Sequence, residues 1–268
     1  MKLIFSHDVD HLYSRDHWFR DAVYPKLWIR ETGNFFGGRI SSREWRRRML
    51  SCFKHERNCI SELLIFDKEN GIRSTYFFGM NKGLGMSYKP HEAEDMILFV
   101  KNSGFDVGVH GICFENIQGI KKERKAFFDL LGFVPTGIRM HYVRYNQETF
   151  ENLNKAGYLF DSTEFDKSLG YCIKDPYRIG NMWEFPICVM DSYLPYNLGE
   201  AKKFTIKALQ TAEENSLEYF TILFHDPYYG EEYKEYKQWY QWLVSYVHDM
   251  NMENISFMDA VKELLQNV

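Results

Sequence analysis

The chain has 268 residues, which is enough for one large α/β domain and short for two full ones. Hydrophobic residues make up 45% of it and charged residues 26%, as in ordinary soluble globular proteins, and the formal net charge is −4. This balance argues against a nucleic-acid-binding protein, and no apolar run approaches the roughly 20 residues of a membrane span.

The start of the chain and its cysteines bear on the cellular compartment. Met1 and Lys2 run directly into an apolar strand pattern, without the apolar segment and cleavage site of a signal peptide. An odd number of cysteines with no CxxC pair is typical of a reducing compartment. The five are Cys52, Cys59, Cys113, Cys172 and Cys188. We therefore expect a cytoplasmic protein with free thiols.

Short apolar runs alternate with helical patterns along the whole chain. The predicted strands cover residues 3–7, 74–78, 105–109, 137–140, 158–161, 182–186 and 220–224, with a short one near Ile255. The predicted helices cover about 16–30, 42–69, 91–102, 119–131, 146–156, 199–215, 232–250 and 257–266. Ser42 precedes one helical pattern, Pro90 suits a first helical position, Asn146 can cap a helix and Gly157 can end it.

The alternation of strands and helices predicts a parallel sheet with right-handed crossovers. A barrel and a doubly wound sheet give the same pattern, but no GxGxxG follows the first strand, which weakens a dinucleotide-binding fold. Without an internal repeat or a linker, we expect a single domain over residues 1–268. The segment at about 16–71 is long for one connection between strands, and we expect it to be a helical insertion over one side of the barrel.

Charged and polar side chains follow the predicted strands where each strand ends. In parallel α/β folds these carboxyl ends meet on one side of the sheet, where ligands bind. The residues concerned are His7, Asp8 and Asp10 after the first strand, His110 after the third, Arg139 and His141 after the fourth, Asp161 after the fifth, and His225 with Asp226 after the seventh. The sequence therefore predicts a site at this edge.

Asp8 and Asp10 are separated by one residue and point the same way while the strand remains extended. One carboxylate can bind a metal while the other takes a proton from the attacking water. Alternatively, the segment is a turn, where aspartate is common. The histidines at other strand ends favour the metal site.

The other strand ends have their own alternatives. Gly108 and Gly111 flank His110, as where the backbone approaches a ligand, although a lone histidine there is more often a core residue. A buried Arg139 needs a carboxylate partner, for which Asp8 is the natural candidate. His225 beside a carboxylate suits a general acid, but a strand-ending turn explains the same segment nearly as well.

Seven motifs, SHDVDH, STYFF, DVGVHG, GIRMHY, FDST, WEFP and ILFHDP, occur in an order that resembles the polysaccharide deacetylases (carbohydrate esterase family 4). They extend from Ser6 to Asp226. The motif sequences HDVDH, RMHYVR and MDSYL resemble those of a bacterial subgroup linked to surface-polysaccharide and O-antigen genes. The resemblance implies a partial (β/α)7 barrel and a hydrolase that removes N-acetyl groups from sugars with a divalent metal, usually zinc.

The resemblance also implies roles for individual residues. Asp8 resembles the catalytic base, Asp10 and His110 resemble metal ligands, Arg139 resembles the arginine that orients the base, and His225 resembles the general acid. The second histidine of the family's H-x-x-x-H motif should stand at position 114, where this chain has Phe114. His141 is the best replacement ligand, ahead of His7 and His11.

The substrate side of the site stays open at this point. Tyr142, Trp183 and Tyr228, and also Tyr193, could stack on a sugar or be ordinary packing residues. Either Asp191 or Asp226 could hold His225. Two rival functions also remain, namely a sugar-binding relative that has lost its metal and a deacylase acting on a nucleotide-linked or lipid-linked sugar.

Overall fold

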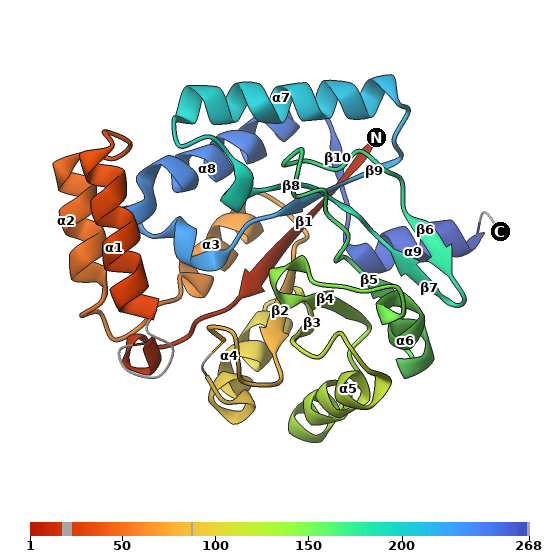
Figure 1. Ribbon diagram of the computed structural model, residues 1–268. Coiled ribbons are helices and arrows are strands. Elements are labelled where there is room, and N and C mark those ends of the chain that lie inside the picture. The colour runs from red at the N-terminus through yellow and green to blue at the C-terminus, as the bar shows by residue number, and fades with distance from the viewer. Residues whose placement is uncertain (18–22, 87, 267–268) are drawn as a thin grey trace.

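The computed structural model describes residues 1–17, 23–86 and 88–266, and Figure 1 shows that the strands form a curled sheet surrounded by helices. The order of the hydrogen-bonded strands is β6-β7-β5-β4-β3-β2-β1-β9-β8, and β10 pairs with the start of β1. Every pairing is parallel except the one between β6 and β7. The expected partial α/β barrel is therefore confirmed.

The strands are short and largely buried on both faces, as expected where helices cover a parallel sheet. They are β1 (Lys2–Val9), β2 (Thr75–Gly79), β3 (Asp106–Gly111), β4 (Gly137–Met140), β5 (Phe160–Asp161), β6 (Tyr177–Ile179), β7 (Met182–Glu184), β8 (Ile187–Met190), β9 (Tyr219–Leu223) and β10 (Glu253–Asn254). β6 and β8 were not predicted as separate strands.

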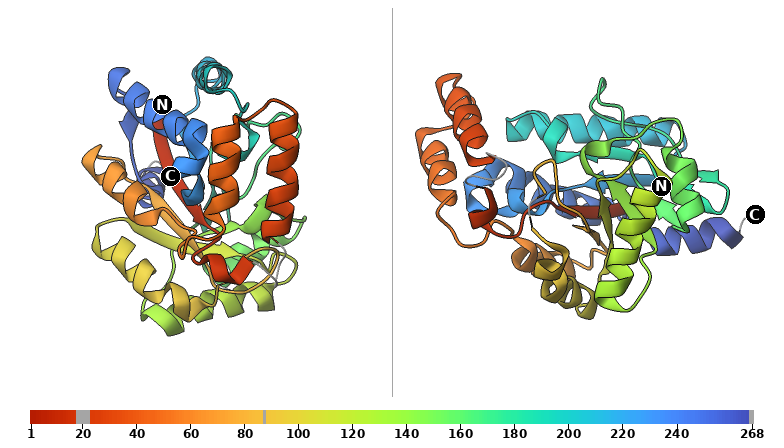
Figure 2. Two further views of the ribbon diagram at one scale, coloured as in Figure 1. Left: turned by 90° about the vertical axis from the view of Figure 1, so that its left-hand side faces the viewer. Right: turned by 60° about the horizontal axis from the view of Figure 1, so that its bottom comes forward.

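The helices surround the sheet, and Figure 2 shows them from two further sides. They are α1 (Val23–Phe36), α2 (Ser42–Ser51), α3 (Ile60–Glu69), α4 (Pro90–Asn102), α5 (Ile117–Leu131), α6 (Thr149–Ala156), α7 (Leu198–Glu214), α8 (Lys234–Asp249) and α9 (Phe257–Gln266). None of the described helices is both long and apolar enough to cross a membrane. All five cysteines have free thiols.

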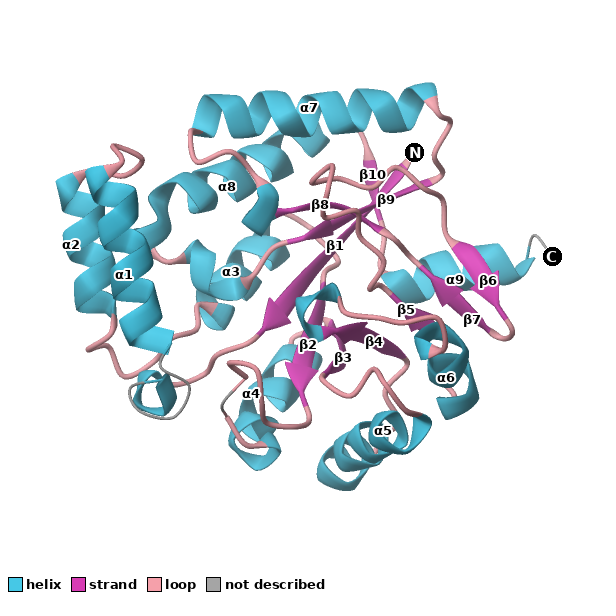
Figure 3. Cartoon of the chain, viewed as in Figure 1, coloured by secondary structure: helices cyan, strands magenta, loops and turns pink. Residues whose placement is uncertain are grey.

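The chain itself joins the two sides of the curled sheet. β8 is the last strand of the sheet path and β7 lies next to its other end, yet only Phe185 and Pro186 separate them in sequence. The two edges must therefore lie close together, as the curled sheet in Figure 3 shows. The strand predicted over 182–186 is β7, which ends two residues earlier, at Glu184, because Pro186 has no N–H for a ladder and the chain changes edges there.

The predicted helix over 42–69 was wrong, because the structure divides it into α2 and α3. Between them, the chain runs beside the segment that leaves β1. Arg57 donates its backbone N–H to the carbonyl oxygen of Leu12, and Ser14 donates to that of His55. These long-range hydrogen bonds compete with helical ones. α1 and α2 form a pair outside the ring of helices (Figure 1), whereas α3 packs in the ring and buries Leu63 and Leu64 in the main core.

Helix ends follow the local signals in part. Pro90 opens α4, and Gly157 ends α6 with a φ of 89°, both as predicted. Ser42, which the sequence placed before a helix, is the first residue of α2. Ser41 caps this helix and forms a capping box with Glu44. Asn146 lies two residues before the cap of α6, where its side chain accepts the N–H of Glu148. The helix predicted over 16–30 corresponds to α1 and to a short 3-10 turn (Ser14–His17), and its residues 18–22 lie outside the described part of the chain.

Candidate active site

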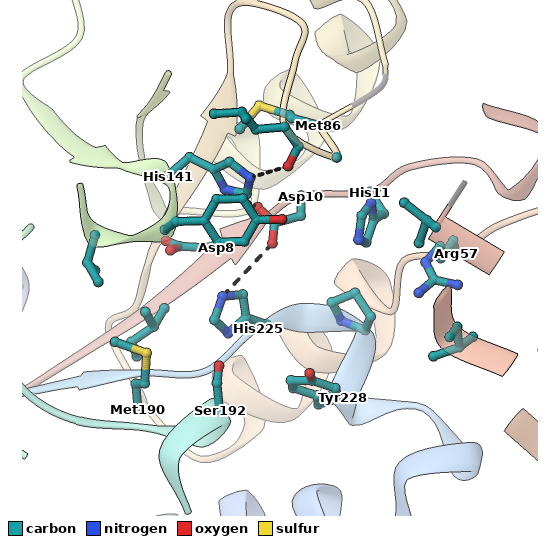
Figure 4. Close-up of a pocket in the computed structure, with 18 of the residues that line it drawn as sticks. Asp8, Asp10, His11, Arg57, Met86, His141, Met190, Ser192, His225 and Tyr228 are labelled. Atoms are coloured by element: carbon teal, nitrogen blue, oxygen red, sulfur yellow. Dashed lines mark hydrogen bonds and ion pairs between the residues drawn. The ribbon is translucent and has the colours of Figure 1, made fainter. Parts of the chain in front are cut away.

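The carboxyl ends of four strands bring the predicted site residues together. Asp8 and Asp10 come from β1 and its end, His110 from β3, Arg139 and His141 from β4 and its end, and His225 follows β9. Because β4, β3, β2, β1 and β9 are consecutive in the sheet, these residues face a common space. Figure 4 shows Asp8, Asp10, His141 and His225 around it. The loop after each strand then turns outward toward its helix.

Asp10, His110 and His141 form a compact group of three potential metal ligands. The Oδ1 atom of Asp10 lies 3.2 Å from His110 Nε2 and 3.1 Å from His141 Nδ1. The two imidazole nitrogens lie 3.0 Å from each other. Each residue therefore presents one atom to the same point.

The remaining ring nitrogens decide which atoms are free to bind a cation. His110 Nδ1 donates to the backbone carbonyl of Arg139 (3.1 Å), and His141 Nε2 donates to that of Leu84 (3.0 Å). A carbonyl oxygen only accepts, so the neutral rings carry their protons on these outer nitrogens. The inner nitrogens then present lone pairs to each other, and the buried Oδ1 of Asp10 makes no hydrogen bond to any described residue. Three facing electron-pair donors fit a metal ion well.

The electrostatics of Asp10 agree with this fit. Burial alone would raise the pKa of the Asp10 carboxyl, but the nearby His141 and His110 lower it well below its usual range. One carboxylate and two imidazoles form the donor set of catalytic zinc sites, in which the fourth position stays open. The carbonyl partners of both rings are the outer contacts that orient metal-binding histidines.

The position of the missing histidine lies away from this group. The Phe114 ring packs at the edge of the main core, where the guanidinium of Arg144 lies 4.8 Å from its centre. His141 reaches the ligand position because the chain turns sharply after β4, with left-handed φ angles of 59° at Tyr142 and 45° at Val143. Such angles are costly for residues with a side chain and are typical of functional sites.

Asp8 and Arg139 form the buried ion pair that the sequence predicts. Arg139 NH1 donates to Asp8 Oδ1 (3.0 Å), and its other donors bind the carbonyl (2.7 Å) and the hydroxyl (2.8 Å) of Ser162. The guanidinium also covers the Phe77 ring at 4.6 Å. Since Arg139 occupies Oδ1, the second oxygen of Asp8 is left to face the metal ligands, 3.7 Å from His110 Nε2.

His225 is held by Asp191 and not by Asp226. His225 Nδ1 lies 2.9 Å from Asp191 Oδ1, and the His225 backbone N–H donates to Asp191 Oδ2 (2.5 Å). Burial alone would lower the pKa of His225, but Asp191 raises it to about 10. The ring is thus an imidazolium at neutral pH, with Nε2 4.0 Å from Asp10 Oδ2. The Asp226 carboxylate instead accepts the backbone N–H of Cys59.

A cavity of about 1100 Å³ opens above these residues. Tyr142, Tyr193 and Tyr228 line it, and Tyr142 is 58% exposed. Trp183 is the exception, because it is buried in a second core cluster with Phe160 and does not line the cavity. Of the two alternatives for Trp183, packing is therefore the one that the structure supports, and its predicted contact with a sugar was wrong.

Asp161 also lies below the site instead of in it. Its Oδ1 accepts the hydroxyl of Thr163 (2.7 Å), and Asp161 is the register partner of Glu184 on the neighbouring strand β7. Burial raises the pKa of Asp161 to about 6. Burial, together with the charge of Asp161, raises the pKa of Glu184 well above its usual range. The pair therefore keeps a proton at a pH where exposed carboxyl groups are ionised. Glu184 was not predicted, and its place inside WEFP gave no signal beyond the motif.

Comparisons with known proteins support the fold. No protein-family model matches the chain, and no curated protein matches it. Among solved structures, a protein of Mycobacterium smegmatis described as a polysaccharide deacetylase aligns over 99% of this chain and 90% of its own, with 17% identity and a TM-score of 0.61. A 4-alpha-glucanotransferase from Thermococcus litoralis aligns over 98% of this chain and 40% of its own, with 14% identity and a TM-score of 0.53. The chain thus has the fold of polysaccharide deacetylases, which a glucanotransferase domain shares.

Proposed function

We propose that the chain is a divalent-metal-dependent hydrolase that removes an N-acetyl group from a carbohydrate. The observation that carries the proposal is the group formed by Asp10, His110 and His141, with Asp8 and His225 on either side of it. A fold shared with a glucanotransferase does not determine the reaction. The arrangement of a base, an acid and three ligands around one point does indicate hydrolysis of an acyl bond.

Asp10, His110 and His141 would hold the cation, and zinc suits their donor set best. When bound, it supplies Lewis acidity toward the acyl oxygen and the attacking water. Asp8 accepts the proton of that water through the oxygen that Arg139 leaves free. Arg139 keeps Asp8 ionised and oriented, and the backbone near Tyr142 offers an N–H to the developing oxyanion.

His225 completes the reaction by giving its Nε2 proton to the leaving amine. Asp191 keeps the ring protonated and fixes its orientation from the opposite side. The two charged pairs, Asp8 with Arg139 and His225 with Asp191, therefore assign the base and the acid to separate walls of the site. Tyr142 and Tyr228 are placed to contact the sugar.

We place this activity in the cytoplasm and in the synthesis of a bacterial surface polysaccharide such as O-antigen. The support is the wording of the motifs HDVDH, RMHYVR and MDSYL, which resembles the subgroup linked to such genes. The rival function is a sugar-binding protein without metal, for which Phe114 is the argument. The position of His141 argues against this rival. His141 follows β4 and can supply the third metal ligand that Phe114 cannot.

Acetate release from N-acetylated sugars tests the proposal. The protein should release acetate with added Zn²⁺ and stop when a chelator removes the metal. Tight sugar binding by metal-free protein, with no acetate from any substrate, would favour the binding protein instead.

A further inference from the structure

The cavity has an electrostatic character opposite to that of the whole chain. Five cationic side chains line it, although the chain carries a net charge of −4. These are Lys26, Arg30, Arg57, Lys82 and Lys167. The only lining carboxylates among the described residues are Asp8 and Asp10, which Arg139 and the metal ligands already engage. A neutral sugar polymer gives no reason for this excess of positive charge.

Arg57 is the most informative of the five. Its guanidinium stacks against Tyr24 at 4.9 Å, and its buried Nε has no hydrogen-bond partner among the described residues. Among the described residues, no carboxylate lies within ion-pair distance of Arg57. Burying a cation without a counter-charge is costly. Figure 4 shows Arg57 beside His11 at the side of the cavity, where an incoming anion could supply that charge.

Arg30 adds a further cation to the cavity wall, and it shares its carboxylate partner with another arginine. The Glu31 carboxylate accepts from Arg30 Nε (2.8 Å) and also from the buried Arg48 (2.6 Å). Glu31 thus pairs with both guanidinium groups, and Arg48 also has the Glu44 carboxylate at 3.9 Å. Lys26, one turn before Arg30 on α1, faces the same cavity.

Lys82 and Lys167 bring positive charge from the other walls. Lys167 donates to the backbone carbonyl of Tyr142 (2.9 Å), a neutral acceptor. Within the described part of the chain, neither lysine forms an ion pair with a carboxylate. Cations on four separate segments of the chain surround Asp8 and Asp10, which suits a ligand with more than one negative charge.

We infer that the substrate is an N-acetylated sugar that carries a phosphate or diphosphate ester, an inference that rests on the proposed function. The acetamide lies at Asp10, His110 and His141, and the phosphate oxygens accept from Arg57 and the cations of α1. The cavity of about 1100 Å³ exceeds the space of a single sugar ring and accommodates a second group beyond the phosphate. Guanidinium groups match phosphate oxygens in geometry as well as charge.

Binding to metal-free protein tests the inference apart from catalysis. Calorimetric titrations would compare N-acetylglucosamine, N-acetylglucosamine 1-phosphate, UDP-N-acetylglucosamine and a farnesyl diphosphate-linked N-acetylglucosamine. The phosphorylated sugars should bind roughly tenfold or more tightly than the neutral sugar, as charge-assisted hydrogen bonds imply. The stronger binder of the last two identifies a nucleotide or a lipid as the second group. Equal affinity for the neutral and phosphorylated sugars would overturn the inference.

Variants of Arg57 locate the anion. Arg57→Met should weaken binding of the phosphorylated sugars roughly tenfold and leave the neutral sugar unaffected. Arg57→Lys keeps the charge and serves if the methionine variant does not fold. Lys203→Met, which removes an exposed charge on α7, is the matched control and should change nothing. Unchanged affinity in both Arg57 variants would contradict the assignment.

Acetate release separates this inference from the proposed function. Efficient release from neutral chitin fragments, with no preference for phosphorylated sugars, would uphold the hydrolase and overturn the anionic substrate. Tight binding of phosphorylated sugars with no acetate release from any of them would uphold the anion site and reject the hydrolase.

Discussion

His110 Nε2 and His141 Nδ1 lie 3.0 Å apart, although each ring has its other nitrogen against a backbone carbonyl. Two lone pairs at this distance repel each other unless a proton or a metal ion lies between them. A metal ion in this place would contact both rings and Asp10 at once. Metal should therefore stabilise the folded protein, as any ligand that binds only the native state does.

His141→Ala should lower the affinity for Zn²⁺ by about tenfold or more, because it removes one of three protein ligands. Competition with a chromophoric chelator measures the affinity. His91→Ala, which removes an exposed histidine on α4, is the control and should bind as the unmodified protein does. Unaltered affinity in His141→Ala would mean that another group completes the site.

Asp8→Asn should lower the rate of acetate release by about 10²–10⁴-fold, because the amide cannot accept the proton of water. The variant keeps its shape and the metal ligands, so the zinc content should stay the same. Full activity in Asp8→Asn, still sensitive to chelator, would leave the hydrolase intact and remove Asp8 as its base.

Asp191→Asn should reduce activity more at pH 9 than at pH 6. The Asp191 carboxylate raises the pKa of His225 to about 10, so the ring stays protonated throughout this range in the unmodified protein. Without that charge the pKa of His225 falls, and the ring loses its proton as the pH rises. A pH profile of kcat/KM checks this, and an unmoved alkaline limb would exclude His225 as the acid.

Glu184→Gln should stabilise the protein at pH 8 by about 1–3 kcal/mol and have less effect at pH 4. Burial raises the pKa of Asp161 to about 6, and burial together with the charge of Asp161 raises that of Glu184 well above its usual range. The native pair therefore keeps a proton that the unfolded chain loses above about pH 4, and stability falls as the pH rises through that window. The amide of glutamine replaces the shared proton with a hydrogen bond to Asp161.

Urea unfolding at both pH values measures the effect of Glu184→Gln. Glu213→Gln, on the exposed side of α7, is the control for loss of a carboxylate and should show no such pH dependence. A Glu184→Gln variant that is less stable than the unmodified protein at pH 8 would show that the pair is fully ionised.

The sequence predicted those elements and residue pairs that the local hydrophobic pattern and the geometry of strand ends determine. The strand at 137–140 matches β4 at both ends, and Arg139 pairs with Asp8 as expected. The predictions that were wrong concern features that depend on contacts between distant parts of the chain. No local signal shows that the segment before α3 must bond to residues beyond β1, or that Pro186 joins opposite sides of the sheet. Trp183 was predicted to bind a sugar because a sequence motif does not show whether its aromatic side chain is buried in the core.

The paired helices α1 and α2 have a consequence for how such a protein can diversify. Lys26, Arg30 and Arg57 all belong to the stretch that runs from α1 to the start of α3, and residues 23–59 hold none of the three proposed metal ligands. Most of the proposed contacts to the anion are thus separate in sequence from the proposed metal ligands. Exchanging this stretch between relatives would replace those contacts and leave Asp10, His110 and His141 in place.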